Sequence, residues 1–191
     1  MFIKTPPKRY SVSRARNGSA SISPRPGSIL YTGMAYGVAE HSGVYVGNGE
    51  VVELQGNGRI RKVSVQEFMN TPLQGRPEEL KARFVNMLEA AGRDGLAMLL
   101  GAAPLEQLAS DCWSIYVSCR NGRAVGSQQV ANRALRKIGS RRDYNVIFDN
   151  CHQFCSGCLT GNFENSDNFL SMLKDTAQNT LGADDWRVWA R

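Results

Sequence analysis

The sequence predicts an α+β domain with a small antiparallel β-sheet packed against helices. Between residues 41 and 64, β-branched and aromatic residues are interrupted twice by Asn-Gly, at 48–49 and 57–58, which is the pattern of consecutive β-hairpins. Ala/Leu/Glu-rich stretches elsewhere in the chain favour helices. The length of 191 residues and the hydrophobic content of 42% suit one globular domain.

This domain is expected to cover residues 25–191. Residues 1–24 are rich in Ser, Pro, Arg and Gly, and we predict that they form a flexible basic segment. The first strand is expected in the apolar run 29–31, directly after a Pro-Gly turn at 26–27. The hairpin strands of residues 41–64 then follow.

Helices are predicted in the middle of the chain. The stretch SVQEFMN (64–70) begins with serine, a good N-cap residue, and continues helically. Residues 76–110 combine helix-forming residues with glycine breaks, which predicts a helical insertion of two or three helices. Its apolar piece GLAMLLGAAPL is expected to pack against the core, with contact to a membrane or a partner as the alternative.

The C-terminal part is predicted to contain both kinds of element. The stretch CWSIYVSCR (112–120) indicates a strand, and GSQQVANRALRKIGS (126–140) indicates a helix that Gly139 closes. An extended segment, YNVIFDN (144–150), leads into a helix that starts near Asn150 or Cys151. Trp186 and Trp189 are expected to anchor the last segment.

The net charge of +6, with a pI of about 9.2, bears on partners and location. Such an excess raises the encounter rate with phosphate-bearing surfaces, so an anionic membrane is a candidate partner. Nucleic acid is disfavoured, because no aromatic interleaving or known binding motif accompanies the basic residues. The basic start lacks the apolar core of a Sec signal, and no run reaches the roughly 18 apolar residues of a membrane span. We therefore expect a cytoplasmic protein, with signal-independent export as an alternative.

The stretch FDNCHQFCSGCLTG (148–161) places a cysteine at a helix start. Asp149 or Asn150 is the expected N-cap, which puts Cys151 in the first turn. The helix dipole and the free N–H groups there stabilise a thiolate, the reactive form of cysteine. Cys151 is therefore a candidate nucleophile.

Cys151, Cys155 and Cys158 share one stripe of this helix, and the last two are expected in the core, since free cysteines behave as small apolar residues. A zinc site that adds Cys112 and Cys119 is the rival interpretation. It is disfavoured because the i+4 and i+7 spacing does not reproduce the paired C-x-x-C of most structural zinc sites. No metal or cofactor is expected.

A cysteine nucleophile needs a base, and the chain has two histidines. His152 follows Cys151 directly and points about 100° away around the helix, so it receives no catalytic role. His41 begins the predicted hairpin, with Gly43 and Tyr45 next on its face. Gly43 clears space beside the imidazole and Tyr45 offers a hydroxyl, so His41 is the candidate base.

Glu53 is the candidate for orienting the imidazole, and strand parity decides whether it can. A two-residue Asn48-Gly49 turn would place Glu53 on the face opposite His41. A three-residue turn over 47–49 places it opposite Gly43, on the His41 face. The site requires the odd-length loop or a β-bulge, and we predict the odd loop.

Three segments in order, RPGSILY, HSGVYVGNGEVVEL and YNVIFDNCHQFC, resemble the lecithin:retinol acyltransferase-like proteins. These are circularly permuted relatives of the NlpC-type papain-fold peptidases, with histidine before cysteine in the chain. The resemblance covers residues 25–66 and 127–161. Glu53 stands where the animal acyltransferases have a second histidine, and NCHQF replaces their NCEHF, so their retinoid or phospholipid specificity does not carry over.

The resemblance implies a permuted papain-like fold and a thiol acyl-transfer mechanism. Cys151 would attack a carbonyl and form a thioester, His41 would protonate the leaving group, and the Cys151 N–H, with Tyr45 and Asn150 in support, would stabilise the oxyanion. A lipid ester is the first-choice substrate of this hydrolase or acyltransferase. The alternatives are a cysteine peptidase or amidase acting on peptide or peptidoglycan bonds, and an inactive binding module of the same fold.

Overall fold

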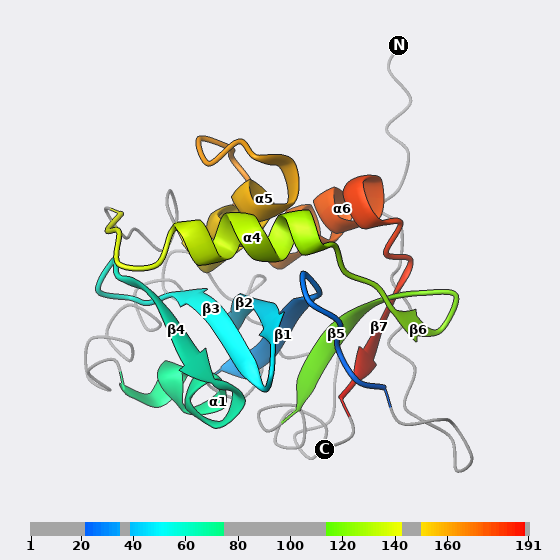
Figure 1. Ribbon diagram of the computed structural model, residues 1–191, viewed down its shortest axis with the longest axis horizontal. Helices are drawn as coiled ribbons and strands as arrows, with labels where there is room; N and C mark the ends of the chain where they lie inside the picture. The colour runs from blue at the N-terminus through cyan, green and yellow to red at the C-terminus, as the bar shows by residue number, and fades with distance from the viewer. Residues whose placement is uncertain (1–21, 35–38, 75–113, 143–149, 190–191) are drawn as a thin grey trace, which may run out of the picture.

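A computed structural model describes residues 22–34, 39–74, 114–142 and 150–189 of the protein. In this part of the chain an antiparallel sheet lies between two unequal helical layers (Figure 1). Helices α4, α5 and α6 cover one face, and α1 covers the other. The protein is thus α+β with a small antiparallel sheet, as predicted.

The sheet has the strand order β4-β3-β2-β1-β5, and β6 and β7 both pair with β5. Every pairing is antiparallel. From β1 to β4, strands that follow one another in the sequence also lie side by side in the sheet. The C-terminal strand β7 pairs with β5. The strands are β1 (Ile29–Met34), β2 (Ala39–Gly47), β3 (Glu50–Leu54), β4 (Ile60–Ser64), β5 (Ile115–Arg120), β6 (Arg123–Ala124) and β7 (Asp185–Val188).

The β2–β3 register is the predicted one. Gly43 pairs with Glu53, so Glu53 shares a face with His41 and lies diagonal to it. The Pro-Gly turn before β1 also docks on this hairpin, since the Gly27 N–H donates to the Tyr45 carbonyl at 2.7 Å. Gly27 has a φ of +81°, and a Cβ there would lie 1.9 Å from the Ser127 carbonyl oxygen, so only glycine fits.

The loop that sets this register differs from the prediction. Gly47 pairs with Glu50, so the connection is the two-residue turn of Asn48 and Gly49, whose φ values of 54° and 73° are those of a type I′ turn. A β-bulge between Tyr45 and Gly47 supplies the extra residue that the three-residue loop was expected to supply. The predicted odd loop is therefore wrong, and the bulge restores the parity.

Helix α1 begins where its capping signal indicates. Ser64 and Glu67 form a capping box at the start of α1, with the Ser64 Oγ accepting from the Glu67 N–H and the Glu67 carboxylate accepting from the Ser64 N–H. Gly139, with a φ of +85°, completes the turns after α4, which itself ends earlier than expected. Within the described residues, no helix is both long and apolar enough to cross a membrane. The helices are α1 (Val65–Gln74), α4 (Gln128–Arg136), α5 (Cys151–Thr160) and α6 (Leu170–Leu181).

Two apolar clusters fill the layers. The larger lies between the sheet and α4, α5 and α6, and contains the fully buried Trp186 of β7, as expected of an anchor. The smaller lies between the sheet and α1 and is built around Phe68 and Val51. Trp189 packs at its border against Tyr45, with ring centroids 5.6 Å apart.

Several predictions fall outside the described residues. These are the helical insertion at 76–110, the extended segment before Asn150, the first two residues of the strand predicted at 112–120, and residues 1–21 of the basic segment. Ile22, inside the segment predicted to be flexible, packs against the smaller cluster.

Candidate active site

Cys151 is the first residue of α5, and Asn150 is its N-cap. The Asn150 Oδ1 accepts hydrogen bonds from the backbone N–H groups of His152 (2.9 Å) and Gln153 (3.3 Å). The Asn150 Nδ2 donates to the Asn168 carbonyl at 2.7 Å, which fixes the cap to the segment before α6. The sulfur is therefore held at the positive end of the helix dipole, where a thiolate is stabilised.

His41 lies near the start of β2 and is oriented by Glu53. The His41 Nε2 is 2.8 Å from the Glu53 Oε2, and the Arg61 Nε donates to the other carboxylate oxygen at 3.1 Å. His41 is 5% exposed and Glu53 fully buried, whereas the Arg61 side chain is one-third exposed. The Glu53 carboxylate is thus fixed by contacts at both of its oxygens, and it holds the imidazole in one orientation.

Cys151 and His41 are in contact across the sheet edge. Burial of His41 lowers its pKa, but its hydrogen bonds and charge interactions with Cys151 and Glu53 outweigh this and raise the pKa from 6.5 to about 10. Burial of Cys151 raises the thiol pKa, but the interactions with His41 and Ser42 outweigh this and lower the pKa below 9.0. Both shifts favour a thiolate–imidazolium pair. Because the His41 Nε2 is hydrogen-bonded to Glu53, Nδ1 is the ring nitrogen that remains to interact with the Cys151 sulfur.

The sulfur reaches His41 because β2 continues beyond its last pairing with β3 at Gly43. Beyond Gly43 this edge presents the Glu40 carbonyl, which lies 3.9 Å from the Cys151 Sγ and accepts from its thiol form, and the Ser42 N–H, whose interaction with the sulfur lowers the Cys151 pKa. Backbone groups two residues apart point to the same edge of a strand, so one edge presents both groups to α5. The start of α5 thus docks on the edge of β2 next to His41.

Gly43 and Phe68 determine the packing beside the imidazole. The Phe68 ring of α1 lies 5.0 Å from the His41 ring between centroids. A Cβ at Gly43 would meet this ring at 2.9 Å and the Val51 side chain at 2.6 Å. The space predicted beside the imidazole therefore exists, and an aromatic side chain fills it and shields the His41–Glu53 pair from water.

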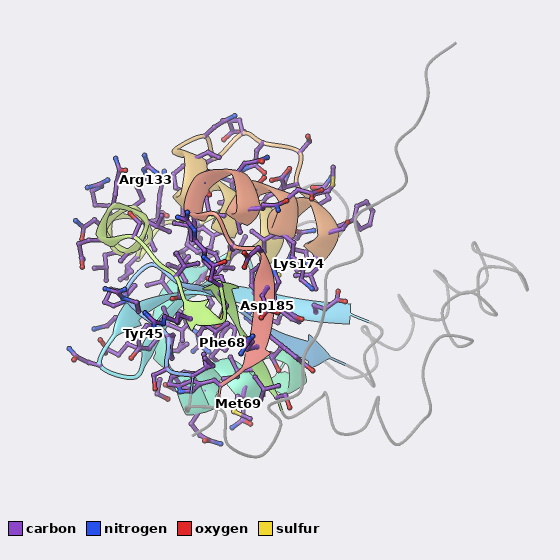
Figure 2. All side chains as sticks on the ribbon, turned by 90° about the vertical axis from the view of Figure 1, so that its right-hand side faces the viewer. Tyr45, Phe68, Met69, Arg133, Lys174 and Asp185 are labelled. Atoms are coloured by element: carbon purple, nitrogen blue, oxygen red, sulfur yellow. The ribbon has the colours of Figure 1, made fainter. Side chains whose placement is uncertain are left out.

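Tyr45 does not join this site. Its hydroxyl accepts a hydrogen bond from the Gly49 N–H at 3.2 Å, at the turn end of the hairpin, and its ring packs on Trp189. Tyr45 is four residues from His41 along β2, roughly 13 Å at the rise of a strand. Figure 2 shows it apart from Lys174 of α6, which lies on the other side of the sheet. The structure gives no support to the expected oxyanion role.

Cys155 and Cys158 are core residues, as predicted. Both are fully buried in the larger cluster, and burial raises the pKa of each thiol. Cys119 is buried on β5, and Cys112 of the rival zinc site lies outside the described residues. Within the described ranges, no three His, Cys, Asp or Glu side chains come together in a way that could hold a metal ion.

Two residues near the site, Ser42 and Lys174, were not predicted from the sequence. Ser42 is fully buried, and its Oγ lies 3.0 Å from the His152 Nδ1. Lys174 of α6 contacts the Tyr31 hydroxyl at 3.3 Å; burial lowers its pKa to about 8, against the opposing charge of Glu40. No local pattern marks these residues, because each reaches the site through packing of α5 and α6 on the sheet.

Comparison with known proteins adds one finding. The family model for lecithin retinol acyltransferase matches residues 23–164, which is most of the chain and includes His41, Glu53 and Cys151. No curated protein and no solved structure matches the chain.

Proposed function

Because the chain belongs to the lecithin retinol acyltransferase family, we propose that it is a thiol-dependent acyl hydrolase or acyltransferase with a Cys151–His41–Glu53 triad. The observation that carries this proposal is the buried His41–Glu53 hydrogen bond of 2.8 Å beside a cysteine at a helix N-terminus. We also infer a circularly permuted papain-like arrangement. It is supported by the histidine strand preceding the cysteine helix in the chain and by their contact at the sheet edge.

In the acylation step, the Cys151 thiolate attacks the carbonyl carbon of the substrate. The negative charge that forms on the carbonyl oxygen lies near the start of α5. Asn150 caps the next two N–H groups, and among the described residues no hydrogen bond uses the N–H of Cys151 itself, so this N–H is the proposed oxyanion donor. The His41 imidazolium then donates its proton to the leaving group, and a thioester forms on Cys151.

In the second step, water or another acceptor attacks the thioester carbonyl. Neutral His41 removes the proton of the acceptor, and the Cys151 thiolate leaves, which restores the ion pair. Glu53 keeps the ring aligned through both steps and stabilises each imidazolium. Arg61, which is partly exposed, holds the second oxygen of Glu53 throughout.

Lipid esters are the proposed first substrate class. Phe169 is 64% exposed and Met172 is 36% exposed, and both lie at the start of α6, next to the carbonyl that Asn150 binds. Large exposed apolar side chains close to a catalytic cysteine suit contact with an acyl chain. The net charge of +6 supports encounter with an anionic lipid surface.

The test is to incubate the purified protein with vesicles of mixed zwitterionic and anionic phospholipid and, separately, with peptidoglycan fragments. We expect release of fatty acid and lysolipid, its loss in Cys151→Ala and His41→Ala, and its retention in Cys158→Ala. The last variant is a matched control, since Cys158 lies buried on the same helix. Cleavage of the fragments with intact vesicles would assign amide chemistry instead.

Thiol labelling separates an enzyme from an inactive binding module. A small electrophile should modify Cys151 near neutral pH much faster than Cys155, and His41→Ala should slow the reaction. Equal labelling of the two cysteines would contradict the proposed catalysis.

A further inference from the structure

A buried hydrogen bond between Ser42 and His152 lies directly behind the reactive sulfur. The Ser42 Oγ and the His152 Nδ1 are 3.0 Å apart, and the two side chains are 0% and 6% exposed. They belong to β2 and α5, so the pair joins the strand of the base to the helix of the nucleophile. The proposed triad leaves both side chains without a role.

His152 is neutral in the folded protein. Burial, reinforced by the positive charges of His41 and Lys174, lowers its pKa to about 4. A neutral imidazole carries one proton, on either Nδ1 or Nε2. The His152 tautomer therefore decides whether Nδ1 donates to Ser42 or accepts from it.

The Ser42 hydroxyl has one proton and three neighbours that can accept it. These are the His152 Nδ1 and the sulfur atoms of Cys151 and Cys155. If Ser42 donates to His152, neither sulfur receives the proton. If instead His152 donates from Nδ1, the Ser42 oxygen acts as acceptor and its proton is available to a sulfur.

The charge of Cys151 decides between these two arrangements. Cys151 is the sulfur with the lowered pKa, whereas burial raises the pKa of Cys155 well above 9.0 and keeps it a thiol. A hydrogen bond to an ionised acceptor is about twice as strong as one between neutral groups. A thiolate at Cys151 would therefore attract the Ser42 proton, which leaves the Ser42 oxygen free to accept from a His152 ring protonated on Nδ1.

We propose that His152 is a positioning residue that acts through Ser42: its Nδ1–H donates to the Ser42 oxygen and directs the serine hydroxyl proton to the Cys151 sulfur. The proposal rests on the proposed function of Cys151 as a thiolate nucleophile. No bond is made or broken at either residue during turnover. The relay stabilises the thiolate before attack and again when the thioester breaks down.

The experiment measures the pH dependence of Cys151 alkylation by iodoacetamide, with peptide mass spectrometry to separate it from the other cysteines. Ser42→Ala and His152→Gln are expected to raise the Cys151 pKa by about one unit, which slows alkylation about tenfold on the acid limb. His152→Asn is the matched conservative variant. Its amide nitrogen is attached to Cγ, as Nδ1 is, whereas the glutamine amide lies one bond further out, near the position of Nε2. Asparagine should therefore restore a pKa close to the original.

The outcomes distinguish the relay from a merely structural contact. A structural contact would lower the melting temperature in all three variants without separating asparagine from glutamine in the thiol pKa, and that result would overturn the proposal. If the unaltered protein itself shows an ordinary thiol pKa, the proposed function fails, and the relay fails with it. A lowered pKa that all variants share would overturn the relay alone.

A measurement on the unaltered chain covers the case in which a variant does not fold. The protein has two histidines, so ¹⁵N shifts of the imidazole nitrogens can be assigned with little overlap. A neutral His152 with its proton on Nδ1 supports the relay. A proton on Nε2 at a pH where Cys151 is ionised contradicts it.

Discussion

Replacing Glu53 by glutamine removes the charge that holds the His41 imidazolium and changes the side-chain volume very little. The carboxylate is fully buried and lies 2.8 Å from the His41 Nε2, so solvent does not screen the pair. Hydrogen bonds to charged groups contribute about 1.5–3 kcal/mol, and one pKa unit corresponds to about 1.4 kcal/mol. The His41 pKa, about 10 in the protein, should therefore fall by roughly one to two units in Glu53→Gln.

The shift has a defined sign in the pH profile. His41 is the proposed general acid, so activity is lost as the pH rises through the His41 pKa. In Glu53→Gln the alkaline limb of kcat/KM should move to lower pH by the same one to two units. The thiolate also loses part of its cationic partner, so the acid limb, set by Cys151, should move to higher pH. The profile narrows from both sides.

The measurement is an NMR titration of the two histidines, combined with kcat/KM against pH on whichever acyl substrate proves active. Glu50→Gln is the matched control. Glu50 lies on the same strand and forms an ion pair with Lys62 at 2.8 Å, but both side chains are more than one-third exposed. Replacing Glu50 is therefore expected to change the His41 pKa very little. A His41 pKa that stays near 10 in Glu53→Gln, or falls equally in the Glu50 variant, would refute the orienting role of Glu53.

Three further predictions concern the packing of the site. Asn150→Ala should lower the free energy of unfolding by about 1 kcal/mol in urea titrations, because two N–H groups lose their acceptor, whereas Asn150→Asp should retain most of the stability. Compared with the double variant Cys151→Ala/His41→Ala, the contribution of the ion pair to stability should be constant between pH 6.5 and 9, since folding moves a proton from thiol to imidazole without net uptake. That contribution should fall below pH 6.5, because the unfolded imidazole binds a proton there and the folded thiolate does not. It should also fall above pH 9, because the unfolded thiol releases its proton there and the folded imidazolium keeps its own. A contribution that changes steadily between pH 6.5 and 9 would contradict the ion pair. Gly43→Ala should cost about 1–3 kcal/mol in thermal denaturation, because its Cβ would come within 2.6 Å of a neighbouring side-chain carbon, whereas Gly56→Ala meets nothing within 4 Å and should be close to neutral.

The elements whose signals are local were predictable from the sequence. The Ser64–Glu67 capping box, the Asn150 cap and the Asn-Gly turns satisfy hydrogen bonds within a few residues, so composition and spacing specify them. The burial of Cys155 and Cys158 follows from the helix period in the same way. These features fixed the positions of the candidate nucleophile and base along the chain before any tertiary contact was known.

The predicted length of the hairpin loop was wrong because the register depends on both loop length and β-bulges, which the sequence does not separate. A three-residue loop and a two-residue turn with a bulge both shift the pairing by one residue and place Glu53 on the His41 face. The Asn48–Gly49 preference for the even turn is satisfied locally, and the bulge beside Tyr45 accommodates the remaining residue. The face on which Glu53 lies was predictable, because the proposed site requires it to share the face of His41. The position of the extra residue in the hairpin was not predictable.

Ser42 could not be predicted from the sequence because it reaches the site at a strand edge. The two-residue period of a strand places residues 41, 43 and 45 on one face of β2, where the site was expected. However, α5 docks at the edge of this strand beyond its pairing with β3, where the Cys151 sulfur lies near the Glu40 carbonyl and the Ser42 N–H. At the edge of a strand, side chains from both faces can reach the sulfur. His41 therefore approaches it from the face covered by α1, and Ser42 from the face covered by α4, α5 and α6. In the proposed mechanism, the end of the strand beyond β3 therefore gives the thiolate three kinds of stabilising group, namely an imidazolium, a backbone N–H and a hydroxyl. Tyr45 lies too far along the same face to contribute.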